Sequence, residues 1–181
     1  IYLLNITICM TRLFLIILTL FVFQSTNSQT QFFGMTPFGG EFESGTVYKT
    51  DSAGNNQSIQ YNFLEIEGAT LFCAELIQAT DGKLYGLTAS GGINGNGVLF
   101  QYDPTSDIYR KKFEFNSAVS GESPYGGLMQ ASNGKLYGMT YAGGVNNKGV
   151  IFEYDPVGEI YTKLLDFDGV LYGAYPKGTL L

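Results

Sequence analysis

The sequence predicts an all-β fold made of repeated four-stranded sheets arranged as β-propeller-like blades, and three observations support this prediction. The chain repeats itself every 52 residues with no insertion, and a fixed period of this kind is typical of solenoids and propellers. Glycine and aromatic residues are abundant and regularly spaced, as in all-β repeat proteins, with 24 Gly, 14 Phe and 13 Tyr. Each period also contains short apolar runs separated by turn residues. The positions in register include Gly34, Gly86 and Gly138; Gly45, Gly97 and Gly149; Asp51, Asp103 and Asp155; and Phe63, Phe115 and Phe167.

One repeat unit, residues 125–168, predicts four short antiparallel strands joined by tight turns. The Asn-Gly pair at 133–134 favours a hairpin with positive φ values, and the Asp-Pro pair at 155–156 favours a β-turn. Between them lies a glycine-rich loop at 142–149. The fourth strand is more polar than the third, so we expect it at the outside of the blade. The predicted strands cover residues 127–131, 135–140, 150–154 and 160–167.

The third strand of this unit is apolar on both faces, which determines how the sheets must be arranged. Side chains alternate between the two faces of a strand, so Val150 and Phe152 lie on one face and Ile151 on the other. A sheet of this kind needs cover on both sides. Radial stacking of like sheets provides that cover and leaves only short edges, which predicts a β-propeller. After residue 28, no segment has the apolar spacing of an amphipathic helix.

Glycines at two kinds of position are predicted to have structural roles. Gly86 and Gly138 lie within predicted strands, where glycine is normally unfavourable, so their recurrence indicates a close approach or a bulge. The Gly-Gly pairs at 39–40, 91–92 and 143–144 are predicted to adopt backbone conformations that a Cβ atom would forbid.

The repeat accounts for about three blades, in register near residues 31–82, 83–134 and 135–181. The last residues, 178–181, match the first strand of a further blade, because Leu180 corresponds to Leu128 and Leu76. Propellers typically have about four to eight blades. We interpret the chain as a fragment of a larger propeller, and two or more copies that close a ring together are the alternative.

The N-terminal residues resemble a secretory signal peptide. A short basic region precedes an apolar run over 13–23, and small polar residues follow, with cleavage predicted after Ser28. The run is shorter than the roughly 20 residues that cross a bilayer, so an uncleaved anchor is the second interpretation. Met10 is the predicted start, and the chain then divides into residues 1–28 and a repeat region, 29–181. We expect a secreted or cell-surface protein with no membrane insertion after removal of the signal.

Composition excludes several classes of function. A net charge of −6 argues against a nucleic-acid partner. The absence of His excludes zinc sites built on His and any Ser-His-Asp or Cys-His arrangement. Cys9 precedes the predicted mature start, so Cys73 is alone and cannot form an internal disulfide. The recurring aspartates lie at turns, and no loop has the calcium-binding pattern, so we expect no metal and no cofactor.

The segment 136–161 resembles the kelch repeat, a propeller blade of about 50 residues. It contains Leu-Tyr-Gly, Gly-Gly, Phe-Glu-Tyr-Asp-Pro and finally a Tyr where kelch repeats usually have Trp. The motif Leu-Tyr-Gly-x-Thr-x-x-Gly-Gly at 84–92 and 136–144, followed by Gly-Val-x-Phe, is similar to the gloeo/verruco-type repeat of bacterial extracytoplasmic proteins. This resemblance covers roughly residues 31–181. It implies a propeller-like fold and an exported location, and it implies no activity, because the repeat brings no catalytic residues with it.

The loops between the second and third strands form the candidate binding site, because they would emerge together at one end of the blades. Their asparagines are suited to hydrogen-bond a polar ligand such as a glycan, with neighbouring tyrosines stacking on it. The candidate residues are Asn94, Asn96, Asn146 and Asn147. We expect a secreted, non-enzymatic β-propeller that binds an extracellular protein or carbohydrate.

Two other functions stay open on the sequence. The first is a carbohydrate-active enzyme that uses Asp or Glu on a propeller scaffold, which requires two carboxyl groups at a defined separation. The second is a structural surface protein whose repeats act as a spacer.

Overall fold

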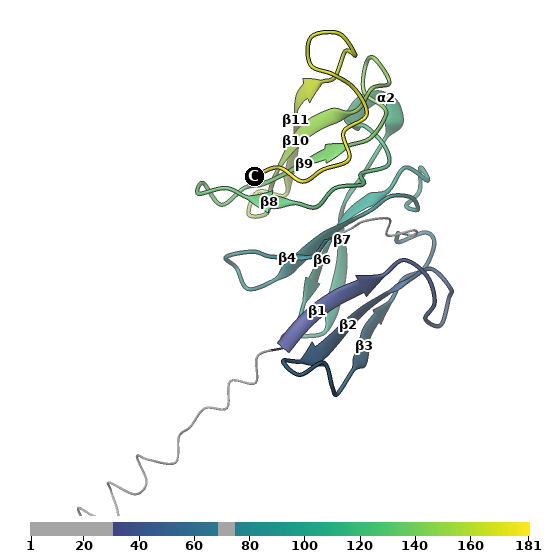
Figure 1. Ribbon diagram of the computed structural model, residues 1–181, viewed down its shortest axis with the longest axis vertical. Helices are drawn as coiled ribbons and strands as arrows, with labels where there is room; N and C mark the ends of the chain where they lie inside the picture. The colour runs from purple at the N-terminus through teal and green to yellow at the C-terminus, as the bar shows by residue number, and fades with distance from the viewer. Residues whose placement is uncertain (1–30, 69–74) are drawn as a thin grey trace, which may run out of the picture. The chain divides into compact units, whose positions relative to one another are not determined.

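Three antiparallel β-sheets follow one another in the computed structural model, which describes residues 31–68 and 75–181 (Figure 1). Blade 1 consists of β1 (Gln31–Thr36), β2 (Thr46–Asp51) and β3 (Ser58–Asn62), which correspond to the second, third and fourth strands of the other two blades. Blade 2 consists of β4 (Ile77–Gln78), β5 (Leu84–Thr88), β6 (Val98–Asp103) and β7 (Ile108–Glu114). Blade 3 consists of β8 (Met129–Gln130), β9 (Leu136–Thr140), β10 (Val150–Asp155) and β11 (Ile160–Asp166). A single helical turn, α2 (Ser117–Ser120), follows blade 2.

Within each blade, every strand pairs with its neighbour in sequence, which confirms the predicted all-β fold, with four-stranded sheets in blades 2 and 3. The three blades are fewer than the about four to eight of a closed propeller, which fits a part of a larger one. The first strand of blade 3 is shorter than predicted. Only Met129 and Gln130 pair with β9, and the N–H of Gly127 donates to Thr179 Oγ1 at 2.9 Å.

The blades share an irregularity that the sequence did not predict. The pairing of the third and fourth strands shifts register between Val47 and Tyr48, between Leu99 and Phe100, and between Ile151 and Phe152. These three steps are 52 residues apart. A bulge bends a strand and increases its twist, so the same local distortion shapes all three sheets.

The glycines within the strands lie under aromatic rings. A Cβ atom on Gly86 would lie 2.6 Å from Cζ of Phe100, and one on Gly138 would lie 2.6 Å from Cζ of Phe152. Each ring belongs to the residue directly opposite its glycine on the neighbouring strand. The predicted close approach is confirmed, and its cause is an aromatic side chain that needs the space of the missing Cβ.

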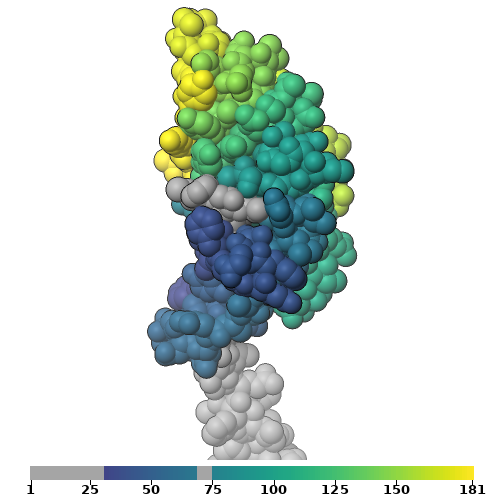
Figure 2. Space-filling model, turned by 90° about the vertical axis from the view of Figure 1, so that its right-hand side faces the viewer, coloured from purple at the N-terminus to yellow at the C-terminus, as the bar shows by residue number. Residues whose placement is uncertain are grey.

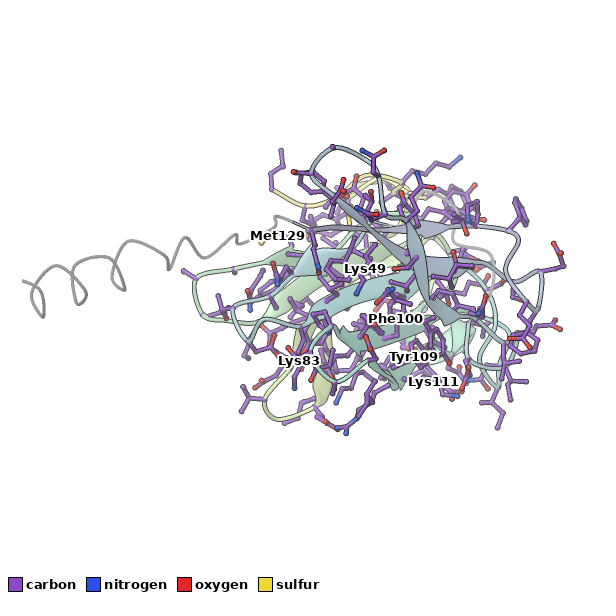
Figure 3. The ribbon with its side chains drawn as sticks, turned by 90° about the horizontal axis from the view of Figure 1, so that it is seen from below. Lys49, Lys83, Phe100, Tyr109, Lys111 and Met129 are labelled. Carbon is purple, nitrogen blue, oxygen red and sulfur yellow. The ribbon has the colours of Figure 1, made fainter. Side chains whose placement is uncertain are left out.

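Aromatic side chains also join one blade to the next at equivalent positions. Tyr61 of blade 1 stacks on Tyr109 of blade 2, with ring centroids 4.3 Å apart and planes 7° apart. Phe113 of blade 2 stacks on Tyr161 of blade 3 at 4.0 Å and 4°. Figure 3 shows Tyr109 beside Phe100 in blade 2, and their ring centroids are 5.4 Å apart. Stacked pairs of this kind add about 0.5–1.5 kcal/mol each beyond the area that they bury.

Two apolar clusters form the core, one between each pair of successive blades. The first cluster combines Val47 and Phe63 of blade 1 with Leu84, Phe100 and Tyr102 of blade 2. The second cluster combines residues of blades 2 and 3, namely Ala79, Tyr85, Leu87, Leu99, Phe115, Leu128, Leu136, Phe152 and Tyr154. Blade 2 therefore contributes both of its faces to the core, as predicted for a sheet that needs cover on both sides.

The predicted signal peptide, its start at Met10, the cleavage site after Ser28, and Cys73 lie outside the described residues. Within residues 31–68 and 75–181, no helix has the length and apolar character needed to cross a membrane.

Candidate binding surface

The loops between the second and third strands have the same backbone in all three blades. Each begins with two glycines in the left-handed region, with φ between 74° and 84°. Each is closed by a hydrogen bond from the N–H of its last glycine to the carbonyl of its first, at 3.0–3.1 Å. The glycines are Gly39, Gly40 and Gly45; Gly91, Gly92 and Gly97; and Gly143, Gly144 and Gly149. Their predicted conformational role is confirmed, because only glycine adopts such φ values without strain.

A polar side chain at the end of each blade's last strand holds the loop. Asn62 accepts a hydrogen bond from the N–H of Glu41 at 3.0 Å. Glu114 accepts one from Ile93 at 2.9 Å, and Asp166 accepts one from Val145 at 2.8 Å. Below, these three loops and the chain segments that follow the fourth strands are together called the loop end.

Two of the side chains that hold the loops, Glu114 and Asp166, are carboxylates and also pair with lysines. Lys163 lies 2.8 Å from Asp166, and Lys111 pairs with Glu114. Burial acts to raise the pKa of Asp166, but the hydrogen bonds from Lys163 and from the Val145 amide outweigh it and hold that pKa below its usual value. The pKa of Glu114 is lowered by the equivalent balance.

The structure brings the four predicted asparagines to the loop end and gives three of their side chains a partner within the chain. The amide groups of Asn94 and Asn146 donate to the carbonyls of Phe115 and Phe167, at 3.0 and 3.1 Å. The side-chain oxygen of Asn147 accepts from the N–H of Gly143 at 3.0 Å. The backbone carbonyl of Asn96 accepts from Ser123 at 3.0 Å. These contacts stabilise the loops, and ligand binding by the four asparagines stays a prediction.

Apolar side chains at the tips of the same loops were not anticipated from the sequence. Ile93 is 85% exposed, Val145 is 77% exposed and Phe42 is 46% exposed. Ile66 and Val119, which follow the fourth strands of blades 1 and 2, are exposed as well. The signal that identifies Ile93 and Val145 is an aliphatic residue directly after the Gly-Gly pair, at a position where both side chains are exposed.

A row of three tyrosines lies at the loop end of blade 3. The ring centroids of Tyr125 and Tyr141 are 5.1 Å apart, and those of Tyr141 and Tyr175 are also 5.1 Å apart. The ammonium group of Lys148 donates to the Tyr175 hydroxyl at 2.7 Å and lies 4.6 Å from the ring centroid. Lys177 lies 5.2 Å from the centroid of Tyr141. Figure 2 shows the residues after β11, in yellow, at the surface.

The recurring aspartates cap the turns at the opposite end of the blades. The side chain of Asp51 accepts from the N–H groups of Ala53 and Asn55, both at 2.9 Å. Asp103 and Asp155 accept from their own turns in the same way. Hydrogen bonds from the backbone lower the pKa of all three carboxyl groups. Their arrangement is that of turn-forming residues.

Two equivalent tyrosines near this end, Tyr85 buried and Tyr137 half-buried, each form hydrogen bonds with a carboxylate and an amide side chain. The Tyr85 hydroxyl lies between Asp81 and the amide of Gln101, at 2.9 and 2.6 Å. The Tyr137 hydroxyl lies between Glu153 and the amide of Asn133, also at 2.6 and 2.9 Å. Asp81 of blade 2 corresponds to Asn133 of blade 3, and Gln101 corresponds to Glu153. The carboxylate and the amide have therefore exchanged positions, and each tyrosine keeps one partner of each kind. Among residues 31–68 and 75–181, no three Cys, Asp or Glu side chains are grouped so that they could hold a metal ion.

The repeat, the Gly-Gly loops and the Tyr-Asp strand ends described above place this chain in a known family. Residues 22–181 match the Gloeobacter/Verrucomicrobia repeat. The chain belongs to this family. The match confirms the closer of the two resemblances seen in the sequence, and the resemblance to the kelch repeat stays a prediction.

Solved structures resemble this Gloeobacter/Verrucomicrobia repeat protein in fold alone. A protein assigned as TolB from Agrobacterium tumefaciens aligns with 76% of the chain at a TM-score of 0.50 and 11% identity. TolB from Acinetobacter baumannii aligns with 72% of the chain at a TM-score of 0.46 and 9% identity, and the alignment covers 33% of that protein. The aligned part of the chain covers 43% of the Agrobacterium protein, so the likeness extends over less than half of that protein's length. No curated protein matches the chain.

Proposed function

We propose that this chain is an exported, non-enzymatic propeller repeat protein that binds an extracellular protein or carbohydrate through its loop end. The observation that carries the proposal is that rigid loops display exposed side chains. The tips at Ile93 and Val145 are among the most exposed apolar residues of the described chain. Exposed apolar groups on rigid loops at one end of the blades are available to contact a partner.

The rigidity of the loops favours binding. Each loop is held by left-handed glycines, by a closing backbone hydrogen bond and by a side chain of the last strand. A surface that is already ordered loses little conformational entropy on binding, so more of the contact energy appears as affinity.

The pattern of constant and variable positions supports the same proposal. The glycines and the strand-end acceptors recur every 52 residues, whereas the tips differ, with Glu41, Ile93 and Val145 at one position and Phe42, Asn94 and Asn146 at the next. Binding sites generally lie on variable loops that a constant scaffold positions. The blade supplies the scaffold, and the tips supply the specificity.

Export and the absence of catalysis are parts of this proposal. Export is supported by the repeat family and by the signal-peptide pattern of residues 1–28. A non-enzymatic role is supported by Asp51, Asp103 and Asp155, whose carboxylates bind the backbone of their own turns. A hydrolase would instead direct two carboxyl groups toward a common cleft.

The test is binding of the full chain to envelope proteins and to a glycan array, with a variant that changes the tips. Replacing Ile93 and Val145 by Ser removes apolar surface while leaving the glycines intact, so we expect binding to a protein ligand to fall at least about tenfold. The matched control is Val157→Ser, which changes a 93% exposed valine at the opposite end.

Two results would contradict the proposal. One is equal binding by the tip variant and by the wild type. The other is turnover of a polysaccharide that a single Asp or Glu substitution abolishes, because this would establish the enzymatic alternative.

A further inference from the structure

The tyrosine row of blade 3 can be compared with the same place in blade 2, where the backbone is alike. The N–H of Tyr175 donates to the carbonyl of Lys148 at 2.9 Å, and the N–H of Ser123 donates to the carbonyl of Asn96 at 3.0 Å. Tyr175 has a φ of 56° and Ser123 a φ of 52°. The proline that follows each of them packs against an equivalent glycine. The two segments therefore share one structure.

The side chains in these two places differ in kind. Blade 2 has Ala89, Asn96 and Ser123 where blade 3 has Tyr141, Lys148 and Tyr175, each pair 52 residues apart. Because the smaller residues of blade 2 support the same backbone, the fold does not require the two tyrosines or the lysine. Their presence in blade 3 needs another explanation.

The backbone conformation of Tyr175 is shared with Ser123, but it suits a bulky side chain less well. Its φ of 56° lies in the left-handed region, where bulky residues are strained and glycine or asparagine is preferred. Strained residues of this kind persist mainly at binding and active sites. Here the strain places an aromatic ring next to Tyr141 and under the Lys148 ammonium group.

The chemistry of the row determines which ligand would fit. Neighbouring rings are tilted by 52° and 35°. Tyr175 is 40% exposed, and Tyr125 and Tyr141 are half-buried, so parts of the three rings are open to solvent beside two ammonium groups. A sugar ring has an apolar face of C–H groups and a rim of hydroxyls, which suits tyrosine rings and their hydroxyl groups. A carboxylate on the sugar would pair with the lysines in charge-assisted hydrogen bonds. An aliphatic peptide segment would cover these polar groups without pairing them, which is costly.

We propose that Tyr125, Tyr141 and Tyr175, together with Lys148 and Lys177, bind an acidic carbohydrate composed of carboxylated sugars. The rings contact successive sugars, and the two ammonium groups pair with their carboxylates. This proposal rests on the proposed function of the loop end and names its ligand.

The experiment is isothermal titration calorimetry of the full chain with oligomers of a uronic acid and with neutral hexose oligomers of the same linkage. The variant Tyr141→Ala/Lys148→Asn/Tyr175→Ser introduces the blade 2 residues, which already fit this backbone. We expect it to bind the acidic oligomer at least about tenfold more weakly and to melt within a few degrees of the wild type. Wild-type binding should also weaken with added salt, because ion pairs contribute to it.

The matched control is Tyr172→Ser, which removes a 58% exposed tyrosine from the same segment but outside the row. It should leave binding unchanged. Equal affinity of the wild type and the triple variant, or preference for the neutral oligomer, would overturn the proposal. Binding of a protein ligand that depends on Ile93 and Val145, with no binding of the acidic oligomer, would overturn it and leave the proposed function intact. Binding of neither kind of ligand would overturn both.

Discussion

The third strands of blades 2 and 3 have similar sequences but are buried to different extents. In β6, every residue from Val98 to Tyr102 is buried, whereas in β10 burial alternates and only Val150, Phe152 and Tyr154 are buried. Leu99 of blade 2 contributes to the core shared with blade 3, and its counterpart Ile151 is half-buried. The comparison teaches that the neighbouring blade, rather than the strand itself, determines how much of a face is buried.

The largest expected effect comes from truncating this pair of residues. Leu99→Ala should lower the free energy of unfolding by about 2–5 kcal/mol, because it leaves a cavity between two packed sheets. Ile151→Ala should cost about half as much or less, because its side chain is partly in water already. Urea unfolding of both variants gives the two values. Equal losses would show that the face of Ile151 is packed as tightly as that of Leu99.

An intermediate effect on stability is expected from removing the hydroxyl groups of two equivalent buried tyrosines, Tyr102 and Tyr154. The Tyr102 hydroxyl donates to Asp107 at 2.7 Å, whereas the buried Tyr154 hydroxyl has no partner among the described residues. The counterpart of Asp107, Glu159, instead accepts from Lys112 at 2.6 Å. Tyr102→Phe should cost about 0.5–1.5 kcal/mol, and Tyr154→Phe should be neutral or stabilising. Thermal melting of the pair distinguishes them, and a costly Tyr154→Phe would indicate a partner for that hydroxyl, such as a buried water.

The smallest effect on stability is expected from the carboxylates that hold the loops of blades 2 and 3. This effect should be the same in both blades, because each loop is held within its own blade. The pKa values of Glu114 and Asp166 are lowered in the folded protein. Their ionised forms therefore stabilise the fold above their ordinary pKa values, and this stabilisation is lost as the pH falls through the folded values. Glu114→Gln and Asp166→Asn should each flatten the acid side of the stability curve by less than about 1 kcal/mol.

Unfolding measured between about pH 6 and pH 2 tests this expectation. Asn62 already fills this role in blade 1 as a neutral amide, so the substituted loops should keep their shape. A much larger effect in one blade than in the other would mean that the loops also depend on a neighbouring blade.

The sequence predicted the repeated parts of the molecule well, for a physical reason. The third and fourth predicted strands, 150–154 and 160–167, agree closely with β10 and β11, because alternation and turn residues act locally. The β-propeller-like arrangement could also be predicted from the sequence, because a sheet that is apolar on both faces has few ways to be covered. The register shifts between the third and fourth strands escaped prediction, because a bulge leaves no mark on the alternation of the third strand.

The candidate site was harder to predict, because its residues interact across turns and between segments. Asn94 and Asn146 looked free to bind a ligand, but each reaches a carbonyl 21 residues further along the chain. The tyrosine row joins residues 125, 141 and 175, which share no spacing and do not recur in blade 2. A search for repeated residues therefore misses this row, because its tyrosines are not repeated.

The stacked aromatic pairs between blades have a consequence for how the molecule unfolds. Tyr61 stacks on Tyr109, and Phe113 stacks on Tyr161, so among the described residues these pairs couple each blade to the next one in sequence. Such a system behaves like a linear chain of cooperative units with nearest-neighbour coupling. Amide exchange should then be slowest in β6 and faster toward both outer blades. Because every blade is also a continuous stretch of sequence with local pairings, its sheet can form early, before the blades associate.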